Sequence, residues 1–287
     1  MIAPVAPPSL ALSTELYGRF GSDLVRVRED QASLYDKWSG HPDRERWPSV
    51  EEAVRLYRAQ PASPLRRSFY RVQGTLLRRR RAREIGLYPQ FDDVEAELTY
   101  LYIRHLRPET VVEISPCGGY STTWILSALR DNEYGHLYSY DVLDHSVHIV
   151  PDELKRERWT FIKGDARTAS LPDGVDYLFI DSNHNGSFAR WYIDKVFPRM
   201  SRAGFVSVDD IVQPPHVAMT GEAKVVLHWL RERKVQFFTA SPSGEKGTFE
   251  AIMKCRRVLG IDTRIHDGVG NPAIFFANPS PVPDPRS

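Results

Sequence analysis

Cysteine is scarce in this chain of 287 residues, which contains two, Cys117 and Cys255. Two cysteines are too few for a disulfide scaffold, and their spacing is not that of a paired metal site. No apolar run reaches the roughly 18 residues that a membrane-spanning helix needs. The start of the sequence also lacks the cationic region and apolar block of a secretory signal. We therefore expect a reduced, cytoplasmic protein without a membrane segment.

Neither sign of charge is in excess. The sequence has 38 Lys and Arg against 37 Asp and Glu, a formal net charge of +1. Such a balance excludes a nucleic-acid coat protein driven by bulk charge. With 41% hydrophobic and 26% charged residues the composition is that of a globular protein, and one sizeable core with a modest appendage is expected.

The residue pattern divides the chain into three regions. Residues 1–90 begin with a proline-rich stretch and then favour short helical pieces with breaks at Gly40 and Pro42. We expect this helical region to form a lid or part of a substrate pocket. Residues 91–278 carry a regular alternation of strand and helix patterns, and residues 279–287 form a proline-rich tail that should carry little structure.

The alternation after residue 90 predicts a doubly wound α/β domain, with a mostly parallel sheet of seven strands and helices on both faces. The expected strands are Val111–Ile114, His136–Asp141, Trp159–Lys163, Val175–Asp181, Phe205–Asp209, Val235–Ala240 and Ala273–Ala277. The expected helices are Asp93–Arg107, Ser121–Arg130, Ser187–Arg199, Glu222–Arg233 and Phe249–Leu259. We expect the last two strands to pair antiparallel.

Nearly every predicted strand ends at an acidic residue. These acids are Glu113, Asp141, Asp165, Asp181 and the pair Asp209 and Asp210. One such acid would be explained as a cap of the following helix. A row of them along the edge where ligands bind in open parallel sheets predicts a binding site.

A turn of small residues, Ser115 to Thr122, follows the first predicted strand and opens a helix. Small residues let the backbone approach a ligand closely, and a helix start offers free N–H groups. The spacing differs from the G-x-G-x-x-G pattern of dinucleotide-binding loops. Without the acids downstream, a tight turn without a ligand would be the simpler interpretation.

From Glu113 to Asp210 the sequence resembles the core of the class I S-adenosylmethionine-dependent methyltransferases, which have a Rossmann-like fold. The resemblance covers about residues 91 to 278. It implies that the loop after the first strand wraps the methionine part of the cofactor and that an acid after the second strand binds the ribose. The cofactor-binding residues that it implies are Glu113, Ser115, Gly119, Tyr120, Ser121, Asp141, Asp165, Ala166 and Asp181. In the family this loop usually reads G-T-G-x-G, and Ser115 and Cys117 stand here at the first two glycines.

A narrower resemblance is to the cation-dependent O-methyltransferases of the caffeoyl-CoA, catechol and macrocin types. It implies a metal site formed by Asp181, Asp209 and Asp210. Three hard oxygen ligands on adjacent strand ends suit Mg²⁺, which can also take two substrate oxygens in place of water. Helix or loop capping by Asp209 or Asp210 is the alternative.

Two histidines are candidates for the catalytic acid-base group. His184 follows Asp181 where the related enzymes tend to carry a lysine, and His216 lies in the loop after the fifth strand. The unperturbed pKa of histidine, near 6.5, suits proton transfer at neutral pH. A solvated loop residue is the alternative for each.

An arginine-rich segment, Arg66 to Arg83, is the strongly biased part of the chain. Arginine binds phosphates and carboxylates through its planar fork. The segment therefore predicts either an edge that attracts an anionic or carrier-bound acceptor or, more simply, a solvated helix face.

From the sequence as a whole we expect methyl transfer to a hydroxyl oxygen of a small molecule, in secondary metabolism, with a divalent metal. The alternatives are an RNA-modifying methyltransferase and a non-catalytic cofactor-binding protein; homodimerisation stays open.

Overall fold

The structure, a computed structural model, describes residues 7–39, 91–215, 217–261 and 272–279. The helices are α1 (Leu10–Ser39), α4 (Asp93–Leu106), α5 (Tyr120–Asn132), α6 (His145–Ile149), α7 (Asp152–Lys155), α8 (Gly186–Lys195), α9 (Gly221–Glu232) and α10 (Lys246–Val258), with a 3₁₀ turn at Phe197–Arg199. The strands are β1 (Thr110–Ile114), β2 (His136–Asp141), β3 (Trp159–Lys163), β4 (Val175–Ile180), β5 (Met200–Val208) and β6 (Ile274–Ala277). The predicted arginine-rich segment and His216 lie outside the described residues.

The strands form one twisted sheet in the order β3-β2-β1-β4-β5-β6, in which every pair is parallel except β5 with β6. The predicted Rossmann-like, doubly wound fold is confirmed. Within the described residues the sheet has six strands. At the place of the predicted strand Val235–Ala240, Phe238 makes an isolated antiparallel bridge to Phe275 of β6. The expected antiparallel pairing of the last two segments is thus reduced to this bridge.

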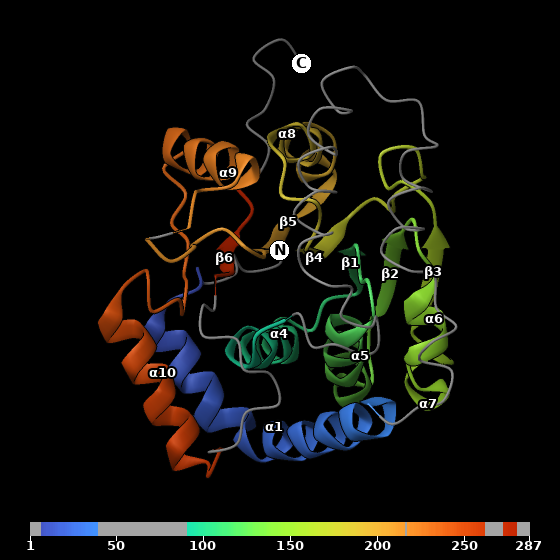
Figure 1. The fold of residues 1–287 in the computed structure, drawn as a ribbon, viewed down its shortest axis with the longest axis vertical. Coiled ribbons are helices and arrows are strands. Elements are labelled where there is room, and N and C mark those ends of the chain that lie inside the picture. Colours follow the sequence, from blue (N-terminus) through green and yellow to red (C-terminus); the bar gives the residue numbers. More distant parts are fainter. Residues whose placement is uncertain (1–6, 40–90, 216, 262–271, 280–287) are drawn as a thin grey trace.

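Successive residues of the central strands bury their side chains on opposite faces of the sheet. Val111 of β1 and Tyr177 of β4 belong to one hydrophobic cluster, whereas Val112 and Leu178 belong to the other. The first cluster packs under α4 and α5, and the second under α8 and α9 (Figure 1). The central strands therefore read as continuous apolar runs, as expected for a parallel sheet covered on both faces.

The N-terminal region differs from the expected short helical pieces. Helix α1 runs without interruption for 30 residues and lies beneath α4 and α5 and beside α10, as part of an outer layer (Figure 1). Ser9 accepts the N–H of Leu12 through its Oγ at 3.2 Å, which caps the first turn. No proline interrupts the helix before Gly40, and packing against α4 and α10 stabilises its full length.

A buried ion-pair network joins α1 and α10 to α4. Arg28 of α1 pairs with Glu97 and also with Asp93, whose Oδ2 lies 3.0 Å from its Nη2. Arg256 of α10 reaches the same two acids, with Nε 3.0 Å from Glu97 Oε2 and Nη2 3.3 Å from Asp93 Oδ2. These charges are compensated where α4 meets both outer helices, so the network fixes their position.

Among the described helices, none is both long and apolar enough to cross a bilayer. The proposed boundaries at residues 90 and 278 are not tested by the fold and stay a prediction.

Candidate functional site

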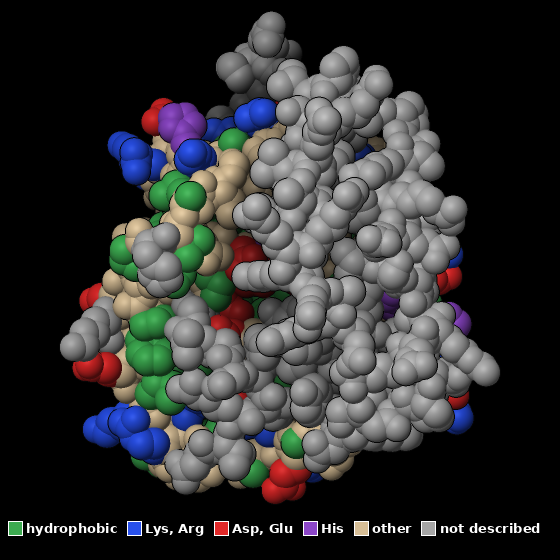
Figure 2. Space-filling view, viewed as in Figure 1, with side chains coloured by type: hydrophobic (Ala, Val, Ile, Leu, Met, Phe, Trp, Pro, Cys, Tyr) green, Lys and Arg blue, Asp and Glu red, His purple; other side chains and the backbone are tan. Residues whose placement is uncertain are grey.

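All the predicted acids except Glu113 lie at the edge of the sheet where the parallel strands end. Neighbouring parallel strands bring their carboxyl ends together, and the strand order reverses between β1 and β4, which is where open α/β sheets form their ligand crevice. A space-filling view shows acidic side chains near the middle of the molecule, between α9 and α4 (Figure 2).

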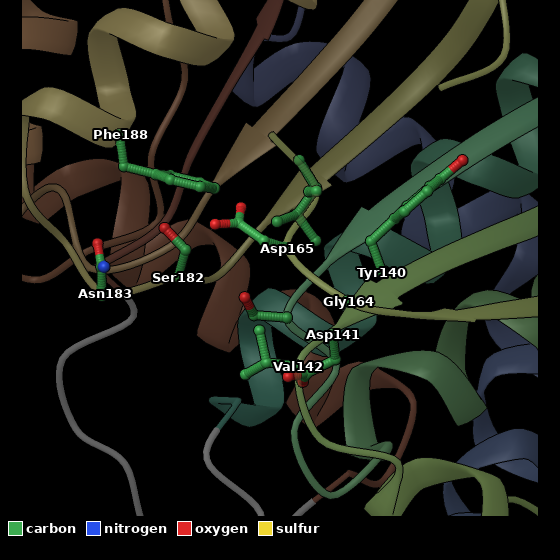
Figure 3. A pocket seen from close by; sticks show the side chains of 11 residues that line it. Tyr140, Asp141, Val142, Gly164, Asp165, Ser182, Asn183 and Phe188 are labelled. Atoms are coloured by element: carbon green, nitrogen blue, oxygen red, sulfur yellow. The ribbon is translucent and has the colours of Figure 1, made fainter. Parts of the chain in front are cut away.

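A pocket opens at this point of the sheet (Figure 3). Its lining residues are Ile114, Ser115, Tyr140, Asp141, Val142, Gly164, Asp165, Ala166, Ser182, Asn183 and Phe188. These residues come from the ends of β1, β2 and β4, from the loop after β3 and from the start of α8. The crevice is therefore built by the strand ends that the sequence singled out.

Asp141, the last residue of β2, lies inside this pocket (Figure 3). Its Oδ2 accepts the N–H of Cys117 at 2.9 Å, and its Oδ1 accepts the N–H of Leu143 at 3.0 Å. Burial raises the pKa of Asp141 to about 6, although its backbone hydrogen bonds oppose this shift. Each carboxylate oxygen keeps a second lone pair, so the group can also accept hydrogen bonds from ligand hydroxyls.

The loop between β1 and α5 takes a strained path that brings its backbone to the pocket. Ser115 and Cys117 have positive φ values of 68° and 47°, and Gly119 has a φ of 84°. A Cβ at Gly119 would lie 2.9 Å from Val150 Cγ2, so glycine is required there for conformation and for space. Serine and cysteine at the family's first two glycine positions therefore adopt the backbone conformations that glycine favours.

Cys117 is not poised as a nucleophile. Burial, together with the charges of Asp141 and Asp181, raises the pKa of its thiol to about 12. A thiol with a raised pKa stays protonated and unreactive at neutral pH, which agrees with a packing role for this side chain.

Glu113 is placed differently from a ligand-binding residue. Its fully buried carboxylate accepts hydroxyl hydrogen bonds from Ser121 at 2.7 Å, Thr122 at 2.8 Å and Ser139 at 2.6 Å. These bonds tie the start of α5 to β1 and β2. Glu113 and Ser121 therefore support the loop from inside, and neither lines the pocket.

Tyr120, the first residue of α5, is 3% exposed and packs edge-to-face against Trp124. Burial raises the pKa of its hydroxyl, so the hydroxyl stays neutral. Tyr120 is absent from the pocket lining, and its predicted contact with the cofactor stays a prediction.

Asp165 and Ala166, which the resemblance implies as cofactor-binding residues, line the pocket after β3. Asp165 and Phe188 of α8 point toward one another across it (Figure 3). Arg167 pairs with Asp165 through two guanidinium nitrogens and lies with Cζ 5.9 Å from the centre of the Phe188 ring. A flat aromatic face beside a polar edge suits a planar heterocycle such as adenine.

A second cluster of charged groups adjoins the pocket at the ends of β4 and β5. His184 lies at its centre: Nε2 is 3.1 Å from Asp210 Oδ2 and 3.7 Å from Asp181 Oδ1, and Nδ1 is 3.0 Å from Glu222 Oε2. Burial alone would lower the pKa of His184, but Glu222, Asp181 and Asp210 raise it to about 10. The imidazole is thus a cation at neutral pH in this arrangement.

The predicted metal ligands are close together, but their arrangement does not fit a metal ion. Among the described residues, no group of three or more His, Cys, Asp or Glu side chains is placed to hold one. Nε2 of the His184 ring lies near both Asp181 and Asp210, so these two carboxylates already have a cationic partner. Burial, with the charges of Asp181 and Asp210, raises the pKa of Asp209 well above its usual value, which favours a protonated carboxyl.

Several residues of the site were not predicted from the sequence. They are the pocket residues Ile114, Tyr140, Val142, Gly164, Ser182, Asn183 and Phe188, and Glu222, which binds His184. Ser182 and Asn183 directly follow the acid at the end of a predicted strand, a position that could have drawn attention to them. Glu222 is 38 residues beyond His184, and no local pattern connects the two.

Comparison with known proteins agrees with this architecture. Residues 112–211 match the family model described as a methyltransferase domain. This stretch contains most of β1, the whole of β2, β3, β4 and β5, and every pocket residue. The sequence-based recognition of a methyltransferase is confirmed for this stretch, which is similar to a methyltransferase domain. No curated protein matches the sequence significantly.

Solved structures with a similar fold include several methyltransferases. A putative O-methyltransferase from Klebsiella pneumoniae is 16% identical, with a TM-score of 0.45, over 83% of this chain and 99% of its own. A putative caffeoyl-CoA O-methyltransferase from Staphylococcus aureus is 14% identical (TM-score 0.43, 78% and 96% covered). TomG from Streptomyces achromogenes, an O-methyltransferase of tomaymycin synthesis in complex with SAM, is 14% identical (TM-score 0.45, 84% and 100% covered).

Proposed function

We propose that this methyltransferase transfers the methyl group of S-adenosylmethionine to a hydroxyl oxygen of a small molecule, in secondary metabolism. One observation carries the proposal. The segment after β4 contributes to both halves of the site, since Ser182 and Asn183 line the cofactor pocket while Asp181 and His184 form the charged cluster next to it. A methyl donor and an acceptor oxygen must lie side by side in this way.

The pocket provides the groups that an adenosine needs. Asp141 offers carboxylate oxygens for the ribose hydroxyls, and Phe188 with Asp165 and Ala166 borders the expected place of the adenine. The backbone of the Ser115–Gly119 loop lies where the methionine part would follow. The sulfonium is an activated donor, so the protein has to hold the acceptor in line with it and favour loss of one proton.

His184 is the group that we assign to the acceptor side. As an imidazolium it donates a hydrogen bond from Nε2 and does not itself accept the hydroxyl proton. Its charge favours the deprotonated form of the acceptor hydroxyl, whose proton leaves to solvent. The oxygen then bonds to the methyl carbon as the bond from that carbon to sulfur breaks, which releases S-adenosylhomocysteine. The divalent cation predicted from the sequence would have the same electrostatic effect. Because the arrangement of Asp181, Asp209 and Asp210 does not fit a metal, no step of the proposed reaction depends on one.

The acceptor's charge and size stay predictions. A small molecule, anionic or carrier-bound, fits the arginine-rich segment of the sequence. RNA modification is the second expectation from sequence; a steep loss of acceptor affinity with salt would favour it.

The experiment that tests the proposed function measures cofactor binding and turnover separately. Calorimetry with S-adenosylhomocysteine should show one site per chain, and Asp141→Ala should weaken binding by about 10- to 100-fold, the equivalent of one charged hydrogen bond. Methyl transfer from labelled S-adenosylmethionine to a panel of phenols and sugars should yield methyl ethers. Absence of both heat and thermal shift in the wild type would support a non-catalytic protein and contradict the proposal.

A further inference from the structure

Glu222, at the start of α9, is fully buried and both of its carboxylate oxygens are engaged. Oε2 accepts the Nδ1–H of His184 at 3.0 Å, and Oε1 accepts the hydroxyl hydrogen of Tyr192 at 3.0 Å. A buried carboxylate that makes two such bonds has one well-defined orientation. The bond to His184 is therefore fixed from the Glu222 side.

The backbone holds the same two residues together. The N–H of Glu222 donates to the carbonyl oxygen of His184 at 3.1 Å. Next to this bond the chains are in close approach, since a Cβ at Gly186 would lie 2.9 Å from the carbonyl oxygen of Gly221. His184 itself has a φ of 51°, an unusual conformation for a residue other than glycine. The start of α8 and the start of α9 thus fix both the backbone and the ring of His184.

The contacts of Nδ1 also determine the direction of the other ring nitrogen of His184, Nε2. With Nδ1 bound to Glu222, Nε2 is directed to the ends of β4 and β5, 3.1 Å from Asp210 Oδ2 and 3.7 Å from Asp181 Oδ1. Asp181 directly precedes the pocket residues Ser182 and Asn183. A rotated ring would present carbon to this side.

We propose that Glu222 is a positioning residue, which holds His184 so that Nε2 faces the acceptor oxygen. The inference rests on the proposed function for the identity of the acceptor, but the orientation of the ring is a property of the protein alone. The arrangement follows the general logic in which a carboxylate orients an imidazole through one nitrogen and leaves the other for the substrate. Glu222 touches neither cofactor nor acceptor in this account.

The test compares Glu222→Gln with Tyr192→Phe. Tyr192→Phe removes the hydroxyl that donates to Oε1 and leaves the carboxylate that binds His184, whereas Glu222→Gln replaces this carboxylate by a neutral amide and so weakens the contact with His184. With ¹⁵N-labelled histidine, the wild type should show a strongly hydrogen-bonded Nδ1–H resonance that disappears in His184→Asn. Tyr192→Phe should keep this resonance, and Glu222→Gln should shift it toward the position of a weak hydrogen bond.

Turnover supplies the second measurement. We expect Glu222→Gln to lower kcat at least about tenfold, with the affinity for S-adenosylhomocysteine unchanged, whereas Tyr192→Phe should lower kcat much less. Equal losses in the two variants, or an unshifted Nδ1–H resonance in Glu222→Gln, would overturn the positioning role. If Glu222→Gln does not fold, absence of the low-field Nδ1–H resonance from the wild type would overturn it. Failure of the wild type to bind S-adenosylhomocysteine would instead count against the proposed function.

Discussion

Asp141 Oδ2 accepts the backbone N–H of Cys117 at 2.9 Å, so the acid that ends β2 also holds the loop that follows β1. Two segments that would contact different parts of one cofactor are thereby connected before it binds. A site connected in this way is already partly ordered, which reduces the entropy lost on binding.

The affinity for S-adenosylhomocysteine should rise with pH and level off above about pH 6. Burial raises the pKa of Asp141 to about 6, and hydrogen bonds from ribose hydroxyls favour the carboxylate form. Calorimetry from about pH 5 to about pH 8 measures this dependence, with Asp141→Asn as the matched control that cannot titrate. If the affinity changed equally with pH in the wild type and in the variant, the role of Asp141 would be contradicted.

The raised pKa of Asp141 also makes the stability of the protein without cofactor depend on pH. An unfolded aspartate has a pKa of about 3.9, so between about pH 4 and pH 6 the native Asp141 binds more protons than the unfolded one. Its contribution therefore makes the free energy of unfolding fall as pH rises through this window. Urea denaturation at a series of pH values should show that the free energy of unfolding falls less between about pH 4 and pH 6 in Asp141→Asn than in the wild type.

Gly119→Ala should destabilise the protein and weaken cofactor binding. The substitution adds about 1–2 kcal/mol of backbone strain at a φ of 84° and about 1–3 kcal/mol from the close contacts with Val150 and Ser146. Gly174 is the matched control, because it has a φ of 68° and a Cβ added there would meet no described heavy atom within 4 Å. Equal losses of unfolding free energy in both variants would contradict a steric requirement at Gly119.

Arg28→Met should cost about 3–5 kcal/mol, because it leaves Glu97 and Asp93 buried with fewer cationic partners. Arg26→Ala on the exposed side of the same helix should cost about 0–1 kcal/mol, since the Arg26 side chain is 47% exposed. Chemical denaturation measures both. A cost for Arg28→Met as small as that for Arg26→Ala would show that the network does not hold α1 in place.

Methyl transfer should continue in the presence of a chelator. His184 lies against both Asp181 and Asp210, so we expect Mg²⁺ to change turnover by no more than about twofold, the level at which an added ion changes a free energy by less than RT. Loss of activity in chelator, restored by Mg²⁺ and abolished by Asp209→Ala, would contradict this expectation. That result would return Asp181, Asp209 and Asp210 to the role of metal ligands.

The fold could be predicted from the sequence because the signals were local. The runs at His136–Asp141 and Trp159–Lys163 are rich in residues that favour strands, and both were placed with their observed bounds. The long helix α1 was predicted as short pieces, because its continuity comes from packing against α4 and α10, and contacts between distant segments leave no local pattern.

The site could be predicted in part for the same reason. Acids at strand ends pointed to Asp141 and Asp165, and both line the pocket, since the topology alone brings strand ends together. Their contact with a cofactor stays a prediction. Sequence could not show that Glu113 turns inward to three hydroxyl groups, or that Glu222 meets His184. Those outcomes depend on the rotamers of side chains and on how α8 packs against α9.

A crystal structure with bound S-adenosylhomocysteine would show directly whether the crevice holds the cofactor. We expect the ribose at Asp141, the adenine beside Asp165 and Phe188, and the sulfur directed toward the segment that carries Asp181 and His184. Density for the ligand elsewhere on the molecule, or an empty crevice at a saturating ligand concentration, would contradict this expectation.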